Sequence, residues 1–179
     1  EKAEAAGLMF GVDIGARGAA TIGGGVATNA GGIRVLRYGM FRAQVAGLEA
    51  VLANGTVLSA LRGLDKDNAG YDLNQLFIGS EGTLGVVTRV HLRLRPKPIE
   101  AANALLAVPS LEAALRLLEL LRGTVGSGLS AFELMVSQVY DGVTEFLGMA
   151  RPVAARQPFY VLAEVQSFHE DHAIERFST

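Results

Sequence analysis

Residues 18–32 read GAATIGGGVATNAGG, and six of these residues are glycine, while none is lysine or arginine. Glycine lets the backbone adopt positive φ and lets a ligand approach closely, and successive peptide N–H groups can form an anion-binding concavity. An anion held here would be bound by main-chain donors and by the hydroxyls of Thr21 and Thr28, which suits a diphosphate. The alternative is a run of tight turns at a sheet edge, and glycine content alone does not choose between the two.

A second glycine-rich segment, residues 77–88, reads FIGSEGTLGVVT and leads directly into an alternating pattern. Such a loop can present backbone N–H and C=O groups to the edge of a ring; the alternative is a plain loop with Gly82 and Gly85 at positive φ. Neither segment ends in Gly-Lys-Ser/Thr or forms a strand-GxGxxG-helix unit. A P-loop ATPase and a nicotinamide Rossmann domain are therefore disfavoured.

The first half of the chain carries one strong strand signal. Asn54-Gly55 separates two apolar runs, at residues 45–52 and 56–61, which predicts a β-hairpin. The polar stretch 62–70 is typical of a surface connection. A short helical turn is expected at 72–77, with Asp72 as its cap.

Residues 86–95 alternate in polarity, which predicts a half-buried strand with Thr88, Val90, Leu92 and Leu94 on one side. The sequence Pro96-Lys97-Pro98 ends this pattern, because proline cannot donate to a ladder and extends the residue before it. We therefore predict two domains, residues 1–98 and 99–179.

The second half alternates strands with helices, which predicts an α+β fold, ferredoxin-like in type. Strands are expected at 101–108, 129–135 and 160–166, and helices at 111–123, 137–147 and 169–177. The first of these helices should be capped by Ser110 and end at Gly123. Its predicted buried face consists of Leu111, Ala114, Leu115, Leu118 and Leu121.

Composition excludes several classes of protein. Sixteen basic and eighteen acidic side chains give a net charge of −2 without a basic block, so no nucleic-acid partner is expected. The absence of cysteine excludes disulfides and thiolate metal sites, and on this basis we expect a cytoplasmic protein. No transmembrane helix or targeting segment is visible, and a start at Glu1 without methionine indicates a fragment.

Four motifs occur together in order: TIGGGVATNAGG at 21–32, RYG at 37–39, LEAVLANG at 48–55 and DNAGYDLNQLFIGSEGTLGVVT at 67–88. This set resembles the FAD-linked oxidases of the vanillyl-alcohol oxidase, or PCMH-type, superfamily. The strings SAFELM at 130–135 and YVLAE at 160–164 are most similar to the branch of D-2-hydroxyglutarate dehydrogenase, D-lactate dehydrogenase and the glycolate oxidase flavin subunit. The resemblance covers nearly the whole chain.

The resemblance implies the second half of a PCMH-type FAD-binding domain, followed by part of a substrate (cap) domain. FAD is the implied cofactor, with the first glycine-rich segment lining its pyrophosphate and flavin and the second holding its adenosine half. Val87 is the residue expected to touch adenine. The implied cofactor-binding residues are Ala20, Thr21, Gly24, Thr28, Asn29, Ala30, Gly31, Gly32, Glu81, Gly82, Thr83, Leu84, Gly85, Val86 and Val87.

The implied reaction is oxidation of a small D-2-hydroxy acid by hydride transfer to the flavin. Gly25 departs from the family pattern, in which many members carry asparagine. The upstream pyrophosphate loop and the downstream His-rich motif are absent, so no catalytic or metal-binding residue is assigned and this piece should retain little cofactor alone.

A homodimer stays open, and the electron acceptor is not specified. The alternatives are a non-catalytic interaction module or a flavoprotein with another substrate, such as an ether-lipid synthase relative, against which SAFELM argues.

Other polar residues have weaker signals. His169 and His172 are spaced for one helix face, but two metal ligands are too few. His91, with Arg89, Arg93 and Arg95, could steer an anion, although a solvated sheet face explains the row equally well. Tyr38 in the RYG motif either flanks the flavin or has a buried structural role.

Overall fold

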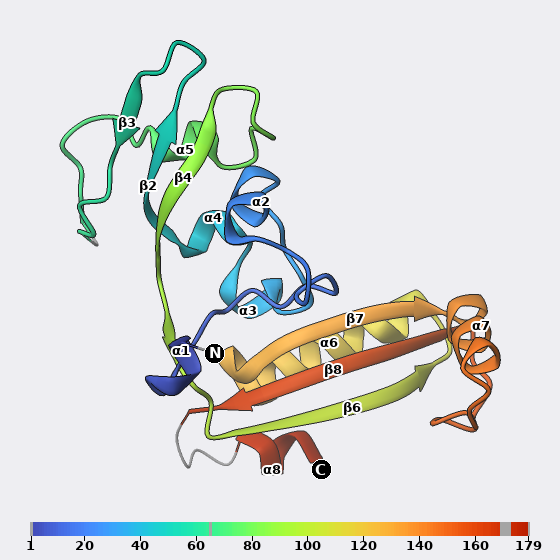
Figure 1. Cartoon of the computed structure of the whole chain (residues 1–179). Coiled ribbons are helices and arrows are strands. Elements are labelled where there is room, and N and C mark those ends of the chain that lie inside the picture. The colour runs from blue at the N-terminus through green and yellow to red at the C-terminus, as the bar shows by residue number, and fades with distance from the viewer. Residues whose placement is uncertain (1, 65, 169–172, 179) are drawn as a thin grey trace. The chain divides into compact units, whose positions relative to one another are not determined.

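A computed structural model describes residues 2–64, 66–168 and 173–178. The chain forms two compact units, residues 1–97 and 98–179, and each is described by itself below. Both mix helices and antiparallel sheet (Figure 1), so the predicted α+β class is confirmed. The assignment of these units to a cofactor domain and a substrate domain stays a prediction.

The first unit is built on a three-stranded antiparallel sheet in the order β3-β2-β4. Strand β2 (Val45–Val51) and β3 (Val57–Ser59) form the predicted hairpin. Gly55 at φ 80° and the bond from the Thr56 N–H to the Asn54 Oδ1 (3.0 Å) make its turn. Asn-Gly therefore acts as the local pattern predicts.

Strand β4 (Val86–Leu92) corrects the predicted alternation. Ala50 of β2 pairs with Val87, but its neighbour Glu49 pairs with Arg89, so Thr88 is the extra residue of a β-bulge. A bulge reverses the faces on either side of it. Val87 consequently packs on the core, while Thr88 is exposed and its hydroxyl donates to the Glu49 carboxylate at 2.9 Å.

The described residues of this unit also form five short helices: α1 (Lys2–Ala5), α2 (Ile22–Ala27), α3 (Val35–Tyr38), α4 (Phe41–Gln44) and α5 (Asn74–Phe77). A second, two-stranded sheet joins β1 (Leu8–Met9) to β5 (Arg95–Pro96). The core of the unit consists of Val26, Phe41, Val45, Leu48, Ala50, Phe77 and Ile78. Helix α2 thus contributes to the core through one side chain, Val26, which is fully buried.

The second unit contains a three-stranded antiparallel sheet in the order β6-β8-β7, formed by β6 (Glu100–Val108), β8 (Phe159–Ser167) and β7 (Leu129–Val136). Both outer strands run antiparallel to β8, so β6, α6 (Leu111–Val125) and β7 form a split β-α-β unit. A 3-10 turn, η1 (Gly126–Gly128), precedes β7, and α7 (Ser137–Phe146) follows it. Helix α8 (Ala173–Ser178) begins after residues 169–172, so the predicted start of that helix and both of its histidines lie outside the described residues.

Helix α6 confirms one prediction and corrects two. The Ser110 Oγ accepts the Ala113 N–H at 3.2 Å, as expected for the cap. The helix runs past Gly123 and ends at Gly126, whose φ of 56° suits a glycine terminator. The buried face is rotated by part of a turn: Leu111 and Leu115 are exposed, whereas Ala114, Leu121 and Val125 are buried.

Candidate functional site

The two glycine-rich segments lie side by side in the first unit. The Gly79 N–H donates to the Val26 carbonyl at 3.0 Å, and the Glu81 N–H donates to the Ala27 carbonyl at 2.8 Å. Both acceptors belong to α2, and both donors belong to the loop that precedes β4, which Figure 1 shows beside α2. The second segment is therefore fastened to the first by main-chain hydrogen bonds.

The two ends of the predicted cofactor site also meet. A Cβ on Gly23 would lie 3.8 Å from the carbonyl oxygen of Val87. Thr28 follows α2 directly, at the end to which the second segment is bonded. The two segments therefore lie close enough together for one ligand to reach both.

The first segment contains a helix that its glycines concealed. Thr21 is the N-cap of α2, and its Oγ1 accepts the Gly24 N–H at 3.0 Å. A hydroxyl that accepts in this way keeps its own proton for another acceptor. At the other end, the Thr28 hydroxyl donates to the Gly24 carbonyl at 2.9 Å. The structure thus leaves Thr21 as a donor toward an anion, while Thr28 offers a lone pair.

Packing explains part of the glycine content. A Cβ on Gly25 would lie 2.4 Å from the Phe41 ring, and one on Gly31 would lie 2.9 Å from Val35. Gly32 has φ 106° and abuts the Asp13 carbonyl. By contrast, a Cβ on Gly18 would meet nothing within 4 Å. Packing therefore accounts for some of the glycines in this segment but not for all of them.

Asn29 follows α2 and is hydrogen-bonded to α4. Its φ of 49° is unusual for a residue with a side chain, and asparagine is among the residues that tolerate it best. Its Oδ1 accepts the Arg42 N–H at 3.0 Å, and the neighbouring Ala30 carbonyl accepts the Phe41 N–H at 2.9 Å. These bonds fix residues 29–30 and engage the Asn29 side-chain oxygen.

The second segment is a compact turn. The Ser80 carbonyl accepts both the N–H and the hydroxyl of Thr83, at 3.0 and 2.6 Å. Glu81 has φ 52° and Gly82 has φ 80°, whereas Gly85 is not in the left-handed region. Gly85 is needed for another reason, because a Cβ there would lie 2.8 Å from the Val51 carbonyl oxygen.

Most of the predicted site residues are accessible. Those exposed are Ala20, Thr21, Gly24, Thr28, Gly32, Glu81, Gly82, Thr83, Leu84 and Val86. Those partly buried are Asn29, Ala30, Gly31, Gly85 and Val87. The side chain of Val87 packs on the core, so its contact with a ligand would be through the main chain, and the exposed side chain beside it is that of Val86.

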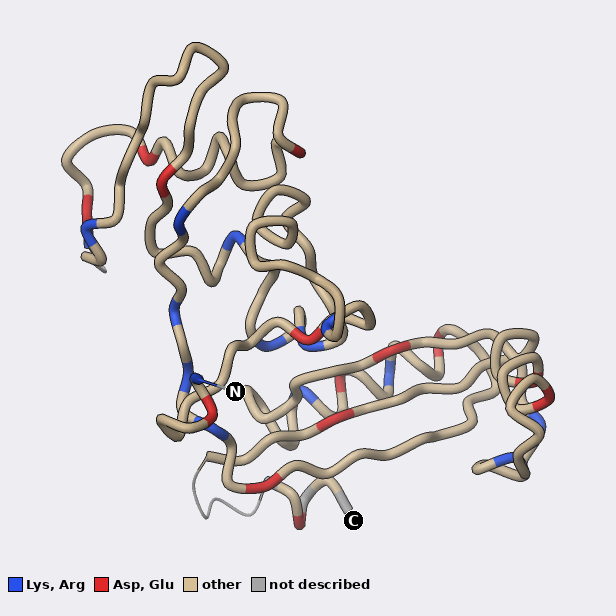
Figure 2. Tube along the Cα trace, in the orientation of Figure 1, with Lys and Arg blue, Asp and Glu red and all other residues tan. Residues whose placement is uncertain are grey.

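The α2 segment itself carries no charged side chain, although the exposed Glu81 lies beside it. Residues 18–33 contain no acidic or basic side chain, and the α2 region of the tube in Figure 2 is correspondingly tan. An anion at α2 would be recognised by neutral donors, which are effective where water is excluded.

The weaker candidates have structural explanations. Tyr38 is buried, and a Cβ on Gly11 would lie 2.8 Å from its ring, so it packs tightly on that glycine. His91 lies against Gly63 in the same manner. Arg93 Nη1 donates to the Val45 carbonyl at 2.8 Å, and Arg89 pairs with Glu49 across 3.6 Å. Arg89, His91 and Arg93 thus make contacts within the first unit, while Arg95 lies exposed in β5.

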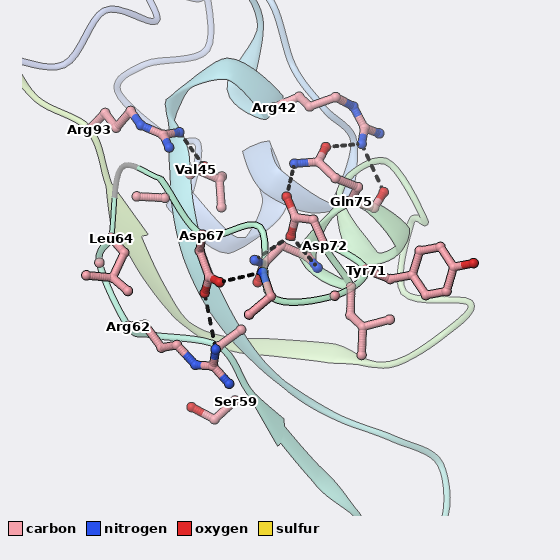
Figure 3. A pocket seen from close by; sticks show the side chains of 17 residues that line it. Arg42, Val45, Ser59, Arg62, Leu64, Asp67, Tyr71, Asp72, Gln75 and Arg93 are labelled. Atoms are coloured by element: carbon pink, nitrogen blue, oxygen red, sulfur yellow. Dashed lines mark hydrogen bonds and ion pairs between the residues drawn. The ribbon is translucent and has the colours of Figure 1, made fainter.

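A pocket of about 320 Å³ lies between the 59–75 segment and the start of β2 (Figure 3). It is distinct from the glycine-rich segments, but Arg42 and Gln75 on its wall reach toward them. Asp72 accepts hydrogen bonds from the Gln75 Nε2 (2.9 Å) and the Asn74 Nδ2 (2.7 Å). It therefore begins α5 through an Asx turn, but the N-cap is Leu73, so the prediction that Asp72 is the cap is wrong by one residue.

Asp72 provides a test by pH. The hydrogen bonds from Gln75, and then from Asn74, lower the pKa of Asp72 below its ordinary value of 3.8. Because the folded pKa is depressed, this stabilisation is present above pH 3.8 and is lost as pH falls through the folded value. We expect Asp72→Asn to cost less than about 1 kcal/mol at pH 7, since the group is exposed and screened. Urea unfolding should show this difference shrinking below pH 4; a constant gap from about pH 7 to 3 would contradict the assignment.

Comparison with known proteins identifies the family. The model for "FAD binding domain" matches residues 1–60, and the model for "FAD linked oxidases, C-terminal domain" matches residues 97–178. The chain belongs to the FAD-linked oxidases. The implied FAD cofactor is thereby confirmed.

Relatives of this FAD-linked oxidase chain include mitochondrial D-2-hydroxyglutarate dehydrogenases of Bos taurus, 49% identical over 97% of the chain, and Rattus norvegicus, 47% identical over 93%. A putative mitochondrial D-lactate dehydrogenase of Schizosaccharomyces pombe is 44% identical over 93%. The match places the chain in the predicted branch. The chain spans about a third of these relatives (32%, 31% and 32%).

Solved structures support the fold of the FAD-linked oxidase chain. An alkyldihydroxyacetonephosphate synthase aligns over 98% of this chain and 35% of its own, with a TM-score of 0.70 and 19% identity. A p-cresol methylhydroxylase aligns over 99% and 38%, with a TM-score of 0.64 and 16% identity. At such identities the likeness concerns the fold alone.

One expectation is wrong. The bovine, rat and fission-yeast relatives are all named as mitochondrial, which argues against the predicted cytoplasmic location of this FAD-linked oxidase. The error arose because a chain without cysteine carries no signal that separates the cytoplasm from other compartments.

Within the described residues, no helix has the length and apolar character needed to cross a bilayer.

The residues present fit part of an FAD. Uncharged backbone at α2 and an open turn at Gly82, where a Cβ would meet nothing within 4 Å, leave room for a ligand held through the main chain. Among the described residues, no group of three or more His, Asp or Glu is arranged to hold a metal.

Sequence analysis missed Arg42, because its partners are 33 and 36 positions away and leave no local signature.

Proposed function

We propose that the protein is an FAD-dependent dehydrogenase of a D-2-hydroxy acid and that this chain holds part of the cofactor. The observation that carries the proposal is the joining of the two glycine-rich segments by the Gly79 and Glu81 N–H groups. The relatives named as D-2-hydroxyglutarate and D-lactate dehydrogenases support the substrate class. The proposal includes glycolate as a candidate substrate, as in a glycolate oxidase subunit.

Each segment receives a role within this proposal. Residues 20–32 would line the pyrophosphate and flavin, with Thr21 as the side-chain donor, and residues 81–87 would hold the adenosine half through the main chain. FAD, when bound, supplies the hydride acceptor. Residues 1–98 would then belong to the cofactor domain and 99–179 to the substrate domain. We also propose a homodimer, which light scattering can check.

The test uses the full-length product of the gene. We expect its visible spectrum to show flavin, and we expect D-2-hydroxy acids to bleach the flavin band under anaerobic conditions, with an artificial dye then reoxidising it. The L-enantiomers serve as matched controls. Absence of flavin with no recovery on adding FAD would instead favour a non-catalytic module, and bleaching by both enantiomers would contradict the D-specific assignment.

A further inference from the structure

Arg42 joins three elements through one side chain and one peptide N–H. Its Nη1 donates to the Gln75 carbonyl (2.9 Å) and to the Gln75 Oε1 (2.6 Å), and Figure 3 shows both bonds. Its Nη2 donates to the Ile78 carbonyl at 2.5 Å. Its main-chain N–H donates to the Asn29 Oδ1 at 3.0 Å. One residue of α4 thus contacts both glycine-rich segments and α5.

This arrangement requires a guanidinium group. The three acceptors belong to residues 75 and 78, and they are met by two nitrogens held in one plane. An ammonium is a single donor centre on a flexible stem and does not reproduce a planar fork. Hydrogen bonds from a charged donor are also stronger than neutral ones.

The position of these bonds matters for the second segment. Ile78 is 2% exposed and anchored in the core, and Gly79, directly after it, bonds to α2. Fixing the Ile78 carbonyl therefore fixes the peptide plane from which the Gly79 N–H emerges. Asn29, held by the same residue, begins the turn that leaves α2.

We propose that Arg42 is a positioning residue that sets the separation of the two glycine-rich segments, so that both contact the same FAD. This inference rests on the proposed function. It differs from a direct electrostatic role, because both terminal nitrogens of the guanidinium donate to neutral carbonyl and amide oxygens. The charge strengthens the clamp and does not meet the cofactor diphosphate.

The experiment compares Arg42→Ala and Arg42→Lys in the full-length protein, with Arg89→Ala as a matched control. Arg89 is an arginine of the same unit whose side chain is 72% exposed and pairs only with Glu49 in the described bonds. We expect the dissociation constant for FAD to rise about 10- to 100-fold in both Arg42 variants, because hydrogen bonds from a charged donor are lost. In Arg89→Ala it should equal that of wild type. Retention of affinity by the lysine variant would overturn the clamp in favour of a simple charge effect.

Chemical rescue separates positioning from general damage. The pocket beside Arg42 opens to solvent, so guanidinium at a non-denaturing concentration can enter the space left by Arg42→Ala. We expect it to restore FAD affinity at least several-fold, whereas urea, which has the same shape without the charge, should not. The proposal would be overturned if guanidinium and urea restored FAD affinity equally, or if neither restored it.

Hydrogen exchange gives a readout that does not depend on FAD. In Arg42→Ala without cofactor, we expect faster exchange at the Gly79 and Glu81 amides and no change on β3. Unchanged exchange at both amides would overturn the clamp even if FAD binds. If wild type itself binds no FAD while exchange changes as expected, the clamp stands and the proposed function fails.

Discussion

Replacing Gly25 with alanine should destabilise the protein by about 3 kcal/mol, the upper part of the range for overpacking a core. A Cβ at this position would lie 2.4 Å from two carbons of the Phe41 ring. That ring has little room to move, because it is 3% exposed and packs edge-on against Phe10 at a centroid distance of 5.2 Å. A larger side chain such as asparagine would be still harder to place against Phe41.

Gly23→Ala is the matched control, two residues away on the same helix. Its Cβ would make an ordinary contact, 3.8 Å from the Val87 carbonyl oxygen. Alanine at a helical position is favoured over glycine by about 1 kcal/mol. Urea unfolding should therefore show the two variants moving in opposite directions from wild type. Equal destabilisation would mean that α2 tolerates no side chain for a reason other than Phe41.

Local patterns predicted the elements whose causes are local. The hairpin at Asn54-Gly55, the Ser110 cap and the strands of the second unit all follow from a few neighbouring residues. Helix α2 could not be predicted this way, since three consecutive glycines have poor helix propensity. It forms because Val26 is buried and Gly25 lets it approach Phe41, and both contacts are tertiary.

The site shows the same division. The glycine-rich segments are visible as composition, but their joining depends on hydrogen bonds between residues more than fifty positions apart, such as Glu81 to Ala27. The bulge at Thr88 also arises from pairing with β2 and decides that Val87 faces the core. Sequence patterns therefore identified where ligand contacts should lie, while side-chain roles within the segments needed the structure.

Thr21 and Thr28 give the sharpest test of those roles. Both are exposed threonines flanking α2, and both were predicted to donate to a diphosphate. Thr21 accepts in its bond to the Gly24 N–H and keeps its proton, whereas Thr28 donates its proton to the Gly24 carbonyl. We expect Thr21→Val to weaken FAD binding by a factor of about 10 or more, because a hydrogen bond to a charged group is lost.

Thr28→Val should change FAD affinity less than about threefold, because valine removes only a bond within the helix. Thr21→Val also removes the cap, which should cost about 1 kcal/mol of stability, so Thr21→Ser is needed to restore both the cap and the affinity. The FAD affinity of all three variants can be measured by titrating the apoprotein with FAD and monitoring the quenching of flavin fluorescence. A larger loss of FAD affinity in Thr28→Val than in Thr21→Val would contradict these roles. The Thr28 hydroxyl would then have to leave the Gly24 carbonyl and donate to the bound diphosphate.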